Sequence, residues 1–151
     1  MKLIEVAIND DRLLEGQEAY FTEISFRFGV EFDPSAGEDE AVSNSRYWNI
    51  VAVDNERVIG CGSLRDLGGG RAEVKRVWVS TNARGKGIAR RLMDWLETKA
   101  ISEGFSTVVL DTNKTLTEAQ AMYHKRGYEE ISRYNDNPYA DHFYEKKLFK
   151  N

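Results

Sequence analysis

The sequence is short of cysteine, histidine and proline. Its 151 residues contain one cysteine, Cys61, so an intramolecular disulfide is excluded and a reducing compartment is expected. With only two histidines, His124 and His142, a metal site would need carboxylates for most of its ligands, and we expect none. Two prolines and 41% hydrophobic residues are typical of a folded globular chain rather than a disordered one.

A basic excess and long apolar runs are also missing. The formal net charge of −4 and a pI near 5.3 argue against a nucleic-acid binder. The apolar run at residues 3–8 is interrupted by Glu5 and is too short for a signal segment, and no run approaches the roughly 20 residues of a membrane span. We therefore expect a cytoplasmic protein without a nucleic-acid or membrane partner, and the length suits one domain over residues 1–151.

The most informative stretch of the chain is residues 71–100. Beta-branched residues in period-two alternation predict a strand over residues 72–79, and turn-forming residues follow it. A helix is then predicted to open within residues 84–89, because apolar residues recur at helical spacing: Ile88, Leu92, Trp95, Leu96 and Ala100. A strand, a glycine-bearing loop and a helix together form a layout that holds phosphates.

The physical basis of phosphate binding is local to the start of that helix. The first amide N–H groups of a helix have no intrahelical acceptor, and the helix dipole places partial positive charge there. Gly85 and Gly87 let a phosphate approach the main chain, and Arg84 and Lys86 add positive charge. The alternative is an ordinary strand-to-helix turn with surface cations.

The loop also carries a family resemblance. Residues 77–79 followed by residues 84–89 resemble the pyrophosphate-binding signature of the GCN5-related N-acetyltransferases (GNAT), [Gln/Arg]-x-x-Gly-x-[Gly/Ala], in which Arg84, Gly87 and Ala89 fill the fixed positions. The resemblance implies acetyl-CoA as the cofactor. The residues that it implies in cofactor binding are Val77, Trp78, Val79, Arg84, Gly85, Lys86, Gly87, Ile88 and Ala89.

Two other phosphate motifs fit the same loop less well. A P-loop requires Lys after its second Gly, but Ile88 follows Gly87. A dinucleotide fingerprint requires a third Gly where this chain has Arg90. A nucleotide-phosphate enzyme therefore stays only as a rival interpretation, next to an acyl-CoA-sensing module without turnover.

A second segment supports the resemblance. Asn113 follows a short apolar strand, and Tyr123 lies in a helix predicted to begin with a capping box at residues 115–118 and to end at Gly127. In the resembled family an Asn near a strand end and a helix Tyr face coenzyme A. The resemblance implies that Asn113 and Tyr123 bind the cofactor and that Tyr123 protonates the leaving thiolate; the alternative is a core tyrosine.

The predicted elements follow the order of the resembled family over essentially the whole chain. The resemblance implies an α/β (α+β) class with the GNAT fold, a mixed twisted sheet of about seven strands flanked by about four helices. Asn9 or Asp10 is expected to cap the first helix, and Asn55 suits a left-handed turn between two strands. The strands are expected over residues 3–8, 47–53, 58–64, 72–79, 106–111, 128–134 and 142–149, and the first two helices over residues 12–28 and 38–45.

Acetyl transfer to an amine requires a base, because an ammonium with a pKa near 10 is no nucleophile at neutral pH. The resemblance implies Glu73 on the central strand, acting directly or through water, with the N–H of Val77 polarising the thioester and Val79 pairing with the pantetheine arm. Strand parity places Glu73, Lys75, Val77 and Val79 on one face unless a bulge intervenes. The alternative for Glu73 is an ion pair with Lys75 or Arg76.

The acceptor side is less defined in sequence. Phe21, Phe26 and Phe28 on the first helix either line a pocket or belong to the core, and residues 134–139 either recognise a polar amine or form a plain hairpin. We expect a small-molecule or peptide amine as partner, and dimers are common in the resembled family, so a homodimer stays open. Cys61 is expected to be a small buried residue, and His124 a surface residue.

Overall fold

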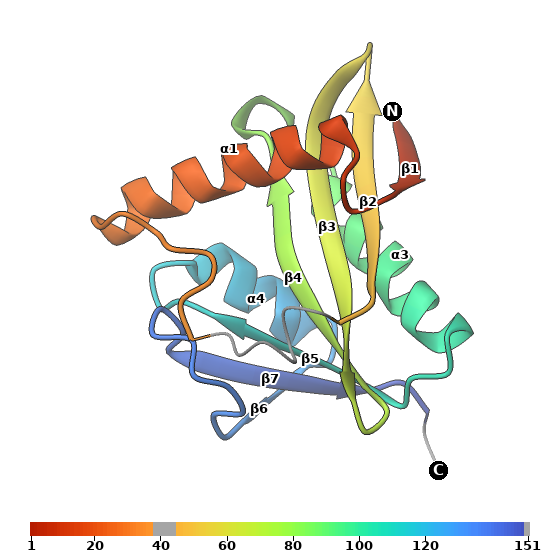
Figure 1. Cartoon of the computed structure of the whole chain (residues 1–151), viewed down its shortest axis with the longest axis vertical. Helices are drawn as coiled ribbons and strands as arrows, with labels where there is room; N and C mark the ends of the chain where they lie inside the picture. Colours follow the sequence, from red (N-terminus) through yellow and green to blue (C-terminus); the bar gives the residue numbers. More distant parts are fainter. Residues whose placement is uncertain (38–44, 150–151) are drawn as a thin grey trace.

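The computed structural model describes residues 1–37 and 45–149, which form one mixed sheet of seven strands in the order β1-β2-β3-β4-β5-β7-β6 (Figure 1). The predicted class and strand number are confirmed, and the described residues hold three α-helices rather than about four. Apart from Ser45, the helix expected over residues 38–45 lies outside the described residues. The elements are β1 (Lys2–Val6), α1 (Asp11–Phe28), β2 (Tyr47–Asp54), β3 (Arg57–Gly68), β4 (Arg71–Val79), the 3₁₀ turn η1 (Thr81–Ala83), α3 (Ile88–Ser102), β5 (Thr107–Thr112), α4 (Thr117–Lys125), β6 (Glu129–Ile131) and β7 (His142–Lys147).

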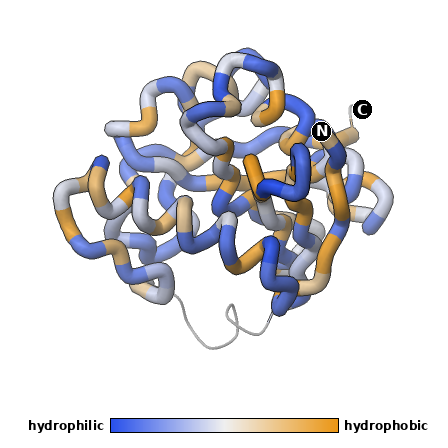
Figure 2. Tube along the Cα trace, turned by 90° about the horizontal axis from the view of Figure 1, so that it is seen from above, coloured by the Kyte–Doolittle hydropathy of each residue, from blue (hydrophilic) through white to orange (hydrophobic). Residues whose placement is uncertain are grey.

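Helices cover both faces of the sheet. Figure 1 shows α1 in front of β2, β3 and β4, whereas α3 and α4 lie behind the sheet. The larger apolar cluster includes Leu92 and Leu96 of α3, and the smaller one joins Leu13 of α1 to Val51 and Cys61. Orange and blue segments alternate along the tube in Figure 2, as expected for elements that bury one side only.

The first helix has the limits that its sequence predicts. Asp10 is the N-cap, and its carboxylate accepts a hydrogen bond of 2.9 Å from the N–H of Arg12. Gly29 ends the helix in a left-handed conformation with φ 71°. A Cβ atom added at Gly16 would lie 3.0 Å from Sγ of Cys61, so α1 packs directly on β3.

The β2–β3 hairpin also follows its sequence. Asn55 and Glu56 connect the strands with φ values of 49° and 65°, which confirms the left-handed turn position of Asn55. A Cβ atom at Gly60 would lie 2.9 Å from the carbonyl oxygen of Trp78. Glycine is therefore required at this position of β3, next to the backbone of β4.

A bulge breaks the alternation of side chains along β4, the exception for which the prediction allowed. Ser63 pairs with Lys75 and Cys61 with Trp78, so β4 uses one residue more than β3 over this distance. Arg76 occupies the bulge with φ 57°. Glu73 and Val79 therefore lie on different faces, the outcome expected if a bulge intervenes. Val79 belongs to the larger cluster next to α3, while Glu73 shares the α1 face with Lys75.

The central strands β4 and β5 are parallel, and they separate early. The pairing joins Arg71 to Thr107, Ala72 to Val108 and Glu73 to Val109, and within the described residues it ends there. Figure 1 shows β4 and β5 running apart beyond this point. The edge of β4 from Val74 to Val79 thus has no strand partner on the side of β5 in the described part of the chain.

The start of α4 differs from its prediction. The helix begins at Thr117 with Leu116 at the N-cap, so the capping box over residues 115–118 does not form. Glu118 instead forms an ion pair with Arg27 of α1. Because a tertiary partner takes the carboxylate, the local capping interaction is lost. The helix does end before Gly127, whose φ is 89°, as expected.

Candidate active site

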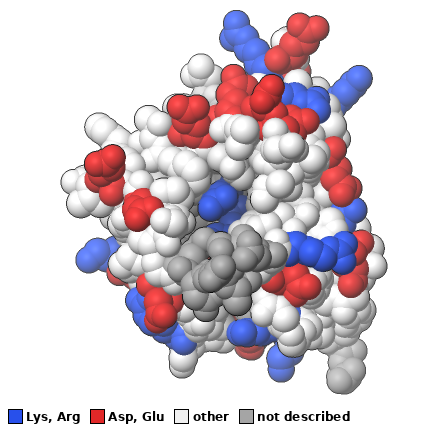
Figure 3. Space-filling model, in the orientation of Figure 1, with Lys and Arg blue, Asp and Glu red and all other residues white. Residues whose placement is uncertain are grey.

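A cavity of about 300 Å³ opens where β4 and β5 separate, and α1, α4 and the β6–β7 connection complete its walls. Figure 3 shows this face of the molecule hollowed between α1 and the strands, with basic surface in the hollow. Of the predicted catalytic and cofactor-binding residues, four line it: Glu73, Val77, Asn113 and Tyr123. Trp78, Val79 and residues 84–89 lie outside the walls that the described residues form.

The carboxylate of Glu73 is buried, with 1% of the residue exposed. Its Oε1 accepts a hydrogen bond of 2.5 Å from Nη2 of Arg65, and its Oε2 accepts one of 2.5 Å from the hydroxyl of Tyr134. Lys75 Nζ lies 4.0 Å from Oε1. Glu73 thus forms ion pairs, as the alternative proposed. Its main partner, however, is Arg65, which lies opposite it on the neighbouring strand, and Arg76 is not a partner.

A second carboxylate, Asp111 of β5, lines the same cavity and was missed in sequence. Its Oδ2 accepts hydrogen bonds from Nδ2 of Asn135 at 2.6 Å and Nδ2 of Asn137 at 3.3 Å. Nδ2 of Asn135 also lies 3.4 Å from Oε2 of Glu73, so one amide bridges both carboxylates. The available signal was a charged residue directly after the buried run of residues 108–110 in the strand parallel to the central one.

Tyr123 is on α4, and its ring packs against those of Tyr128 and Tyr144, with centroids 5.7 and 6.1 Å away. Burial raises the pKa of Tyr123, and the charges of Asp111 and Tyr144 raise it further. No described residue hydrogen-bonds its hydroxyl, although only 8% of the residue is exposed. Tyr123 is thus a protonated phenol at neutral pH with an available O–H group.

Asn113 has a structural role that its sequence position did not reveal. Its Nδ2 donates to the carbonyl of Tyr139 at 2.7 Å, and its Oδ1 accepts from N–H and Oγ1 of Thr115 at 2.9 and 2.8 Å. The side chain therefore ties the end of β5 to the β6–β7 connection. Its place in the cavity wall agrees with the sequence prediction, whereas its part in cofactor binding stays a prediction.

The glycine loop before α3 has the expected backbone. Gly85 and Gly87 have φ values of 80° and 78°, and the first hydrogen bond of α3 runs from N–H of Arg91 to the carbonyl of Gly87 at 3.2 Å. The amides of residues 88–90 therefore have no intrahelical acceptor. Ile88 is buried in the core, where it fixes the helix start.

One cation of this loop forms contacts within the protein, and two others are exposed. Arg84 donates from Nε to the carbonyl of Val79 at 3.0 Å and forms an ion pair with Glu23 of α1, so its side chain ties the loop to α1 and β4. Lys86 and Arg90 are exposed at the helix start. A phosphate at this end would meet free amides and these two cations rather than a free Arg84.

Cys61 and His124 follow their predictions. Cys61 is fully buried, and burial raises the pKa of its thiol to about 12, so it is a packing residue. His124 is exposed.

Within residues 1–37 and 45–149, His, Cys, Asp and Glu side chains form no group of three that suits a metal ion. None of the helices in these ranges combines the length and apolarity that a membrane crossing needs.

The fold and this site define the class of protein. The mixed sheet of seven strands with helices on both faces is the architecture that the sequence resemblance implied. The model of the acetyltransferase (GNAT) family matches residues 11–128 of the chain. The chain therefore belongs to the GNAT family.

Known relatives agree with this membership. An "IAA acetyltransferase" of Azospirillum brasilense is 39% identical over 80 residues, which are 52% of this chain and 52% of that protein. The alignment thus spans about half the length of this relative.

Solved structures share the whole fold. An acetyltransferase of the GNAT family from Staphylococcus aureus Mu50 superposes with a TM-score of 0.81 at 20% identity, over 98% of this chain and all of that chain. PaiA N-acetyltransferase from Thermoplasma acidophilum, solved in complex with coenzyme A, superposes with a TM-score of 0.72 at 15% identity, over 97% and 99% of the two chains. At these identities the likeness concerns the fold alone.

Proposed function

We propose that this protein transfers the acetyl group of acetyl-CoA to a primary amine by direct attack in a ternary complex. The observation that carries the proposal is the cavity at the split between β4 and β5, where a free phenol, Tyr123, and two carboxylates, Glu73 and Asp111, line one space. The acetyltransferase name of the relative from A. brasilense supports the reaction class. Direct transfer is favoured because Cys61 is buried with a raised thiol pKa and lies outside the cavity walls formed by the described residues.

The residues present fit acetyl-CoA. The edge of β4 beyond Glu73 offers backbone groups to an extended pantetheine arm, as an added strand would use them. The start of α3 offers free amides and a helix dipole to the pyrophosphate, with Lys86 and Arg90 beside it. When bound, acetyl-CoA would supply a thioester carbonyl as the acetyl donor. The complex of the PaiA relative with coenzyme A supports this fit.

The proposed roles follow from the chemistry of each group. Tyr123 holds the proton that a departing thiolate needs, because its raised pKa keeps it protonated at neutral pH. The N–H of Val77, directly after the bulge, is the proposed donor to the carbonyl oxygen on which negative charge develops. Glu73 and Asp111, which the strands β4 and β5 place in the cavity wall, are the proposed acceptors of the amine proton, directly or through water.

The experiment that tests this function measures thiol release. Purified protein of residues 1–151 is incubated with acetyl-CoA and a panel of primary amines, and free thiol is followed with time. We expect release that depends on both the protein and an amine. A parallel thermal melt compares coenzyme A with ATP, because a ligand at 100 times its Kd stabilises the folded state by about 2.7 kcal/mol.

Each failure has its own meaning. Stabilisation by coenzyme A with no turnover of any amine would favour an acyl-CoA-sensing module. Stabilisation by ATP alone would favour a nucleotide-phosphate enzyme. The proposal further treats the chain as one domain that acts in the cytoplasm, and gel filtration of the same sample decides between monomer and homodimer.

A further inference from the structure

Arg76 is a cation of the cavity that the proposed reaction does not use. It lines the cavity and is half-buried, and its guanidinium carbon lies 5.2 Å from the ring centroid of Phe21. Among the residues that the structure describes, no carboxylate forms an ion pair with it, in contrast to the neighbouring Arg65, which pairs with Glu73. A half-buried guanidinium of this kind is a ready partner for an anionic group, and a carboxylate matches its two-pronged geometry.

The backbone at Arg76 points to the same conclusion. Its φ of 57° is uncommon for a residue other than glycine, and the conformation costs roughly 1–2 kcal/mol. Bulges of this type occur next to active sites, where they re-aim a side chain. Here the bulge places Arg76 in the cavity wall between Lys75 and Val77, which line the cavity as well.

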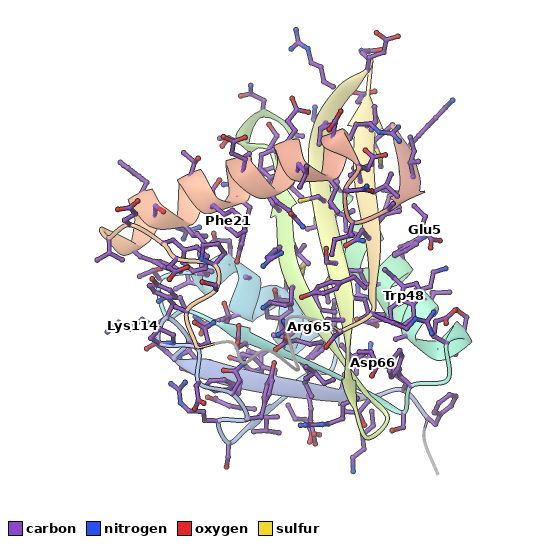
Figure 4. All side chains as sticks on the ribbon, viewed as in Figure 1. Glu5, Phe21, Trp48, Arg65, Asp66 and Lys114 are labelled. Carbon is purple, nitrogen blue, oxygen red and sulfur yellow. The ribbon has the colours of Figure 1, made fainter. Side chains whose placement is uncertain are left out.

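Aromatic rings cover the wall of the cavity beside Arg76. The rings of Phe21 and Phe32 are stacked with centroids 5.6 Å apart, and Tyr139 lies 4.6 Å from Phe32 and 6.0 Å from Phe28. Figure 4 shows Phe21 projecting from α1 towards the strands, with Arg65 further along the same side of the sheet. All four rings line the cavity, and Phe26, which is 86% exposed, points away from it. Such a wall suits an aromatic group, since ring pairs add about 0.5–1.5 kcal/mol beyond area burial.

The volume of the cavity and the charge of Arg76 further restrict the class of acceptor. A volume of about 300 Å³ is at the lower end of the roughly 300–1,000 Å³ typical of small-molecule sites, so it suits a compound of amino-acid size rather than a folded protein. Arg76 already covers one face of Phe21, and its charge would repel the second ammonium of a polyamine.

We propose that the acceptor is an α-amino acid with an aromatic side chain, whose carboxylate is bound by Arg76 and whose ring lies against Phe21, Phe28, Phe32 and Tyr139. This proposal rests on the proposed acetyltransferase function and adds the substrate class. The amine of such a molecule would then share the cavity with the carboxylates of Glu73 and Asp111, the proposed acceptors of its proton. Arg76 is then a specificity-determining residue rather than a catalytic one.

The test removes the substrate carboxylate and the guanidinium of Arg76, separately and together. Acetylation of L-phenylalanine and of 2-phenylethylamine, which lacks the carboxylate, is measured with the wild type, Arg76→Gln and Arg76→Lys. We expect the wild type to prefer L-phenylalanine in kcat/KM by more than about 10-fold, since a hydrogen bond to a charged group contributes about 1.5–3 kcal/mol. Arg76→Gln should lower kcat/KM for L-phenylalanine far more than for 2-phenylethylamine, so that the preference is lost, and Arg76→Lys should restore part of it.

Controls separate this proposal from the proposed function. Arg71→Gln, which removes an exposed cation of the same cavity, should keep the wild-type preference. Equal rates for the two amines in the wild type, or faster acetylation of L-alanine or spermidine, would overturn the aromatic amino-acid class while leaving acetyl transfer intact. If no amine is acetylated, the proposed function fails. Calorimetric titration of L-phenylalanine into wild type and Arg76→Gln then decides the present proposal, and equal or absent binding overturns it.

Discussion

Arg65 of β3 and Glu73 of β4 lie directly opposite each other and form a buried ion pair, with 2.5 Å between Nη2 and Oε1. The side chains are 4% and 2% exposed. Tyr134 of the β6–β7 connection binds the second carboxylate oxygen. Burial raises the pKa of Tyr134, and the charges of Glu73 and Asp111 raise it further, so its phenol stays a donor. Glu73 therefore links the β6–β7 connection, through Tyr134, to strands β3 and β4.

Removing the cation of this pair should destabilise the fold. In Arg65→Met the carboxylate of Glu73 would stay buried without its main counter-ion, and breaking a buried pair in this way costs about 3–5 kcal/mol. Urea unfolding at pH 7 measures the loss. Arg71→Met is the matched control, because Arg71 is exposed and such changes stay within about 0.5 kcal/mol. Equal stability of the two variants would contradict the argument.

The same pair bears on the identity of the base. Oε1 of Glu73 accepts a bond from Arg65 and Oε2 accepts one from Tyr134, whereas the donors to Asp111 among the described residues are the amides of Asn135 and Asn137. We expect Asp111→Asn to lower kcat/KM by about 10²–10⁴-fold, in the range of general bases, and Glu73→Gln to lower it less. The deficit should be largest at low pH, where the amine is protonated, and should shrink as the pH approaches the amine pKa near 10. A larger loss in Glu73→Gln would restore Glu73 as the base.

Much of the fold was readable from the sequence because the determining signals are local. Asp10 and Gly29 limit α1 by capping, and Asn55 sets the β2–β3 turn through its backbone preference. The predictions failed where a distant residue intervenes. Arg27 takes the carboxylate of Glu118 from the capping box, and sequence alone could allow for a bulge in β4 but could not place it.

The site was predictable in its backbone and less so in its side chains. Gly85 and Gly87 have the left-handed conformations that the loop motif requires, and Tyr123 lines the cavity as expected. The partners of Glu73 and Arg84 were not predictable, since Arg65 and Glu23 reach them across strands and from α1. Such contacts depend on register and packing, which a single sequence does not specify.

The proton-donor role of Tyr123 has a direct test. Tyr123→Phe removes only the hydroxyl, which has no hydrogen-bond partner among the described residues, so the fold should be retained. We expect kcat to fall by about 10²–10⁴-fold with little change in the KM for acetyl-CoA. Tyr144→Phe is the control, because its ring lies 6.1 Å away in the same cluster. Unchanged turnover in Tyr123→Phe would exclude Tyr123 as the acid.

The role of the glycine loop in coenzyme A binding can be separated from the effect of backbone strain. Gly87 and Gly104 have φ values of 78° and 87°, so alanine at either position should cost about 1–2 kcal/mol of stability. Only Gly87 lies at the start of α3, where the pyrophosphate is proposed to bind. We expect calorimetry to show weaker coenzyme A binding in Gly87→Ala and unchanged binding in Gly104→Ala. Equal affinities would place the phosphates elsewhere.

The buried carboxylate of Glu97 on α3 should make stability depend on pH. Nε of Arg126 and Nζ of Lys146 bind it at 2.9 and 2.8 Å, and the hydroxyl of Tyr128 binds it at 3.0 Å. Burial acts to raise the pKa of Glu97, but the bonds and charges of Arg126 and Lys146 outweigh burial and hold the pKa below its ordinary value of 4.5. The stabilisation is therefore present above pH 4.5 and is lost as the pH falls through the lowered pKa.

Glu97→Gln should accordingly cost about 1.5–3 kcal/mol at pH 7, and its gap from the wild type should narrow below pH 4.5. Urea unfolding between pH 3 and 8 measures both effects. Glu5→Gln is the control, because Glu5 pairs with Lys99 at an exposed position and such pairs contribute at most about 1 kcal/mol. A gap for Glu97→Gln that stays constant down to pH 3 would show that the charge of Glu97 does not stabilise the fold, and the contacts with Arg126 and Lys146 would then act through packing alone.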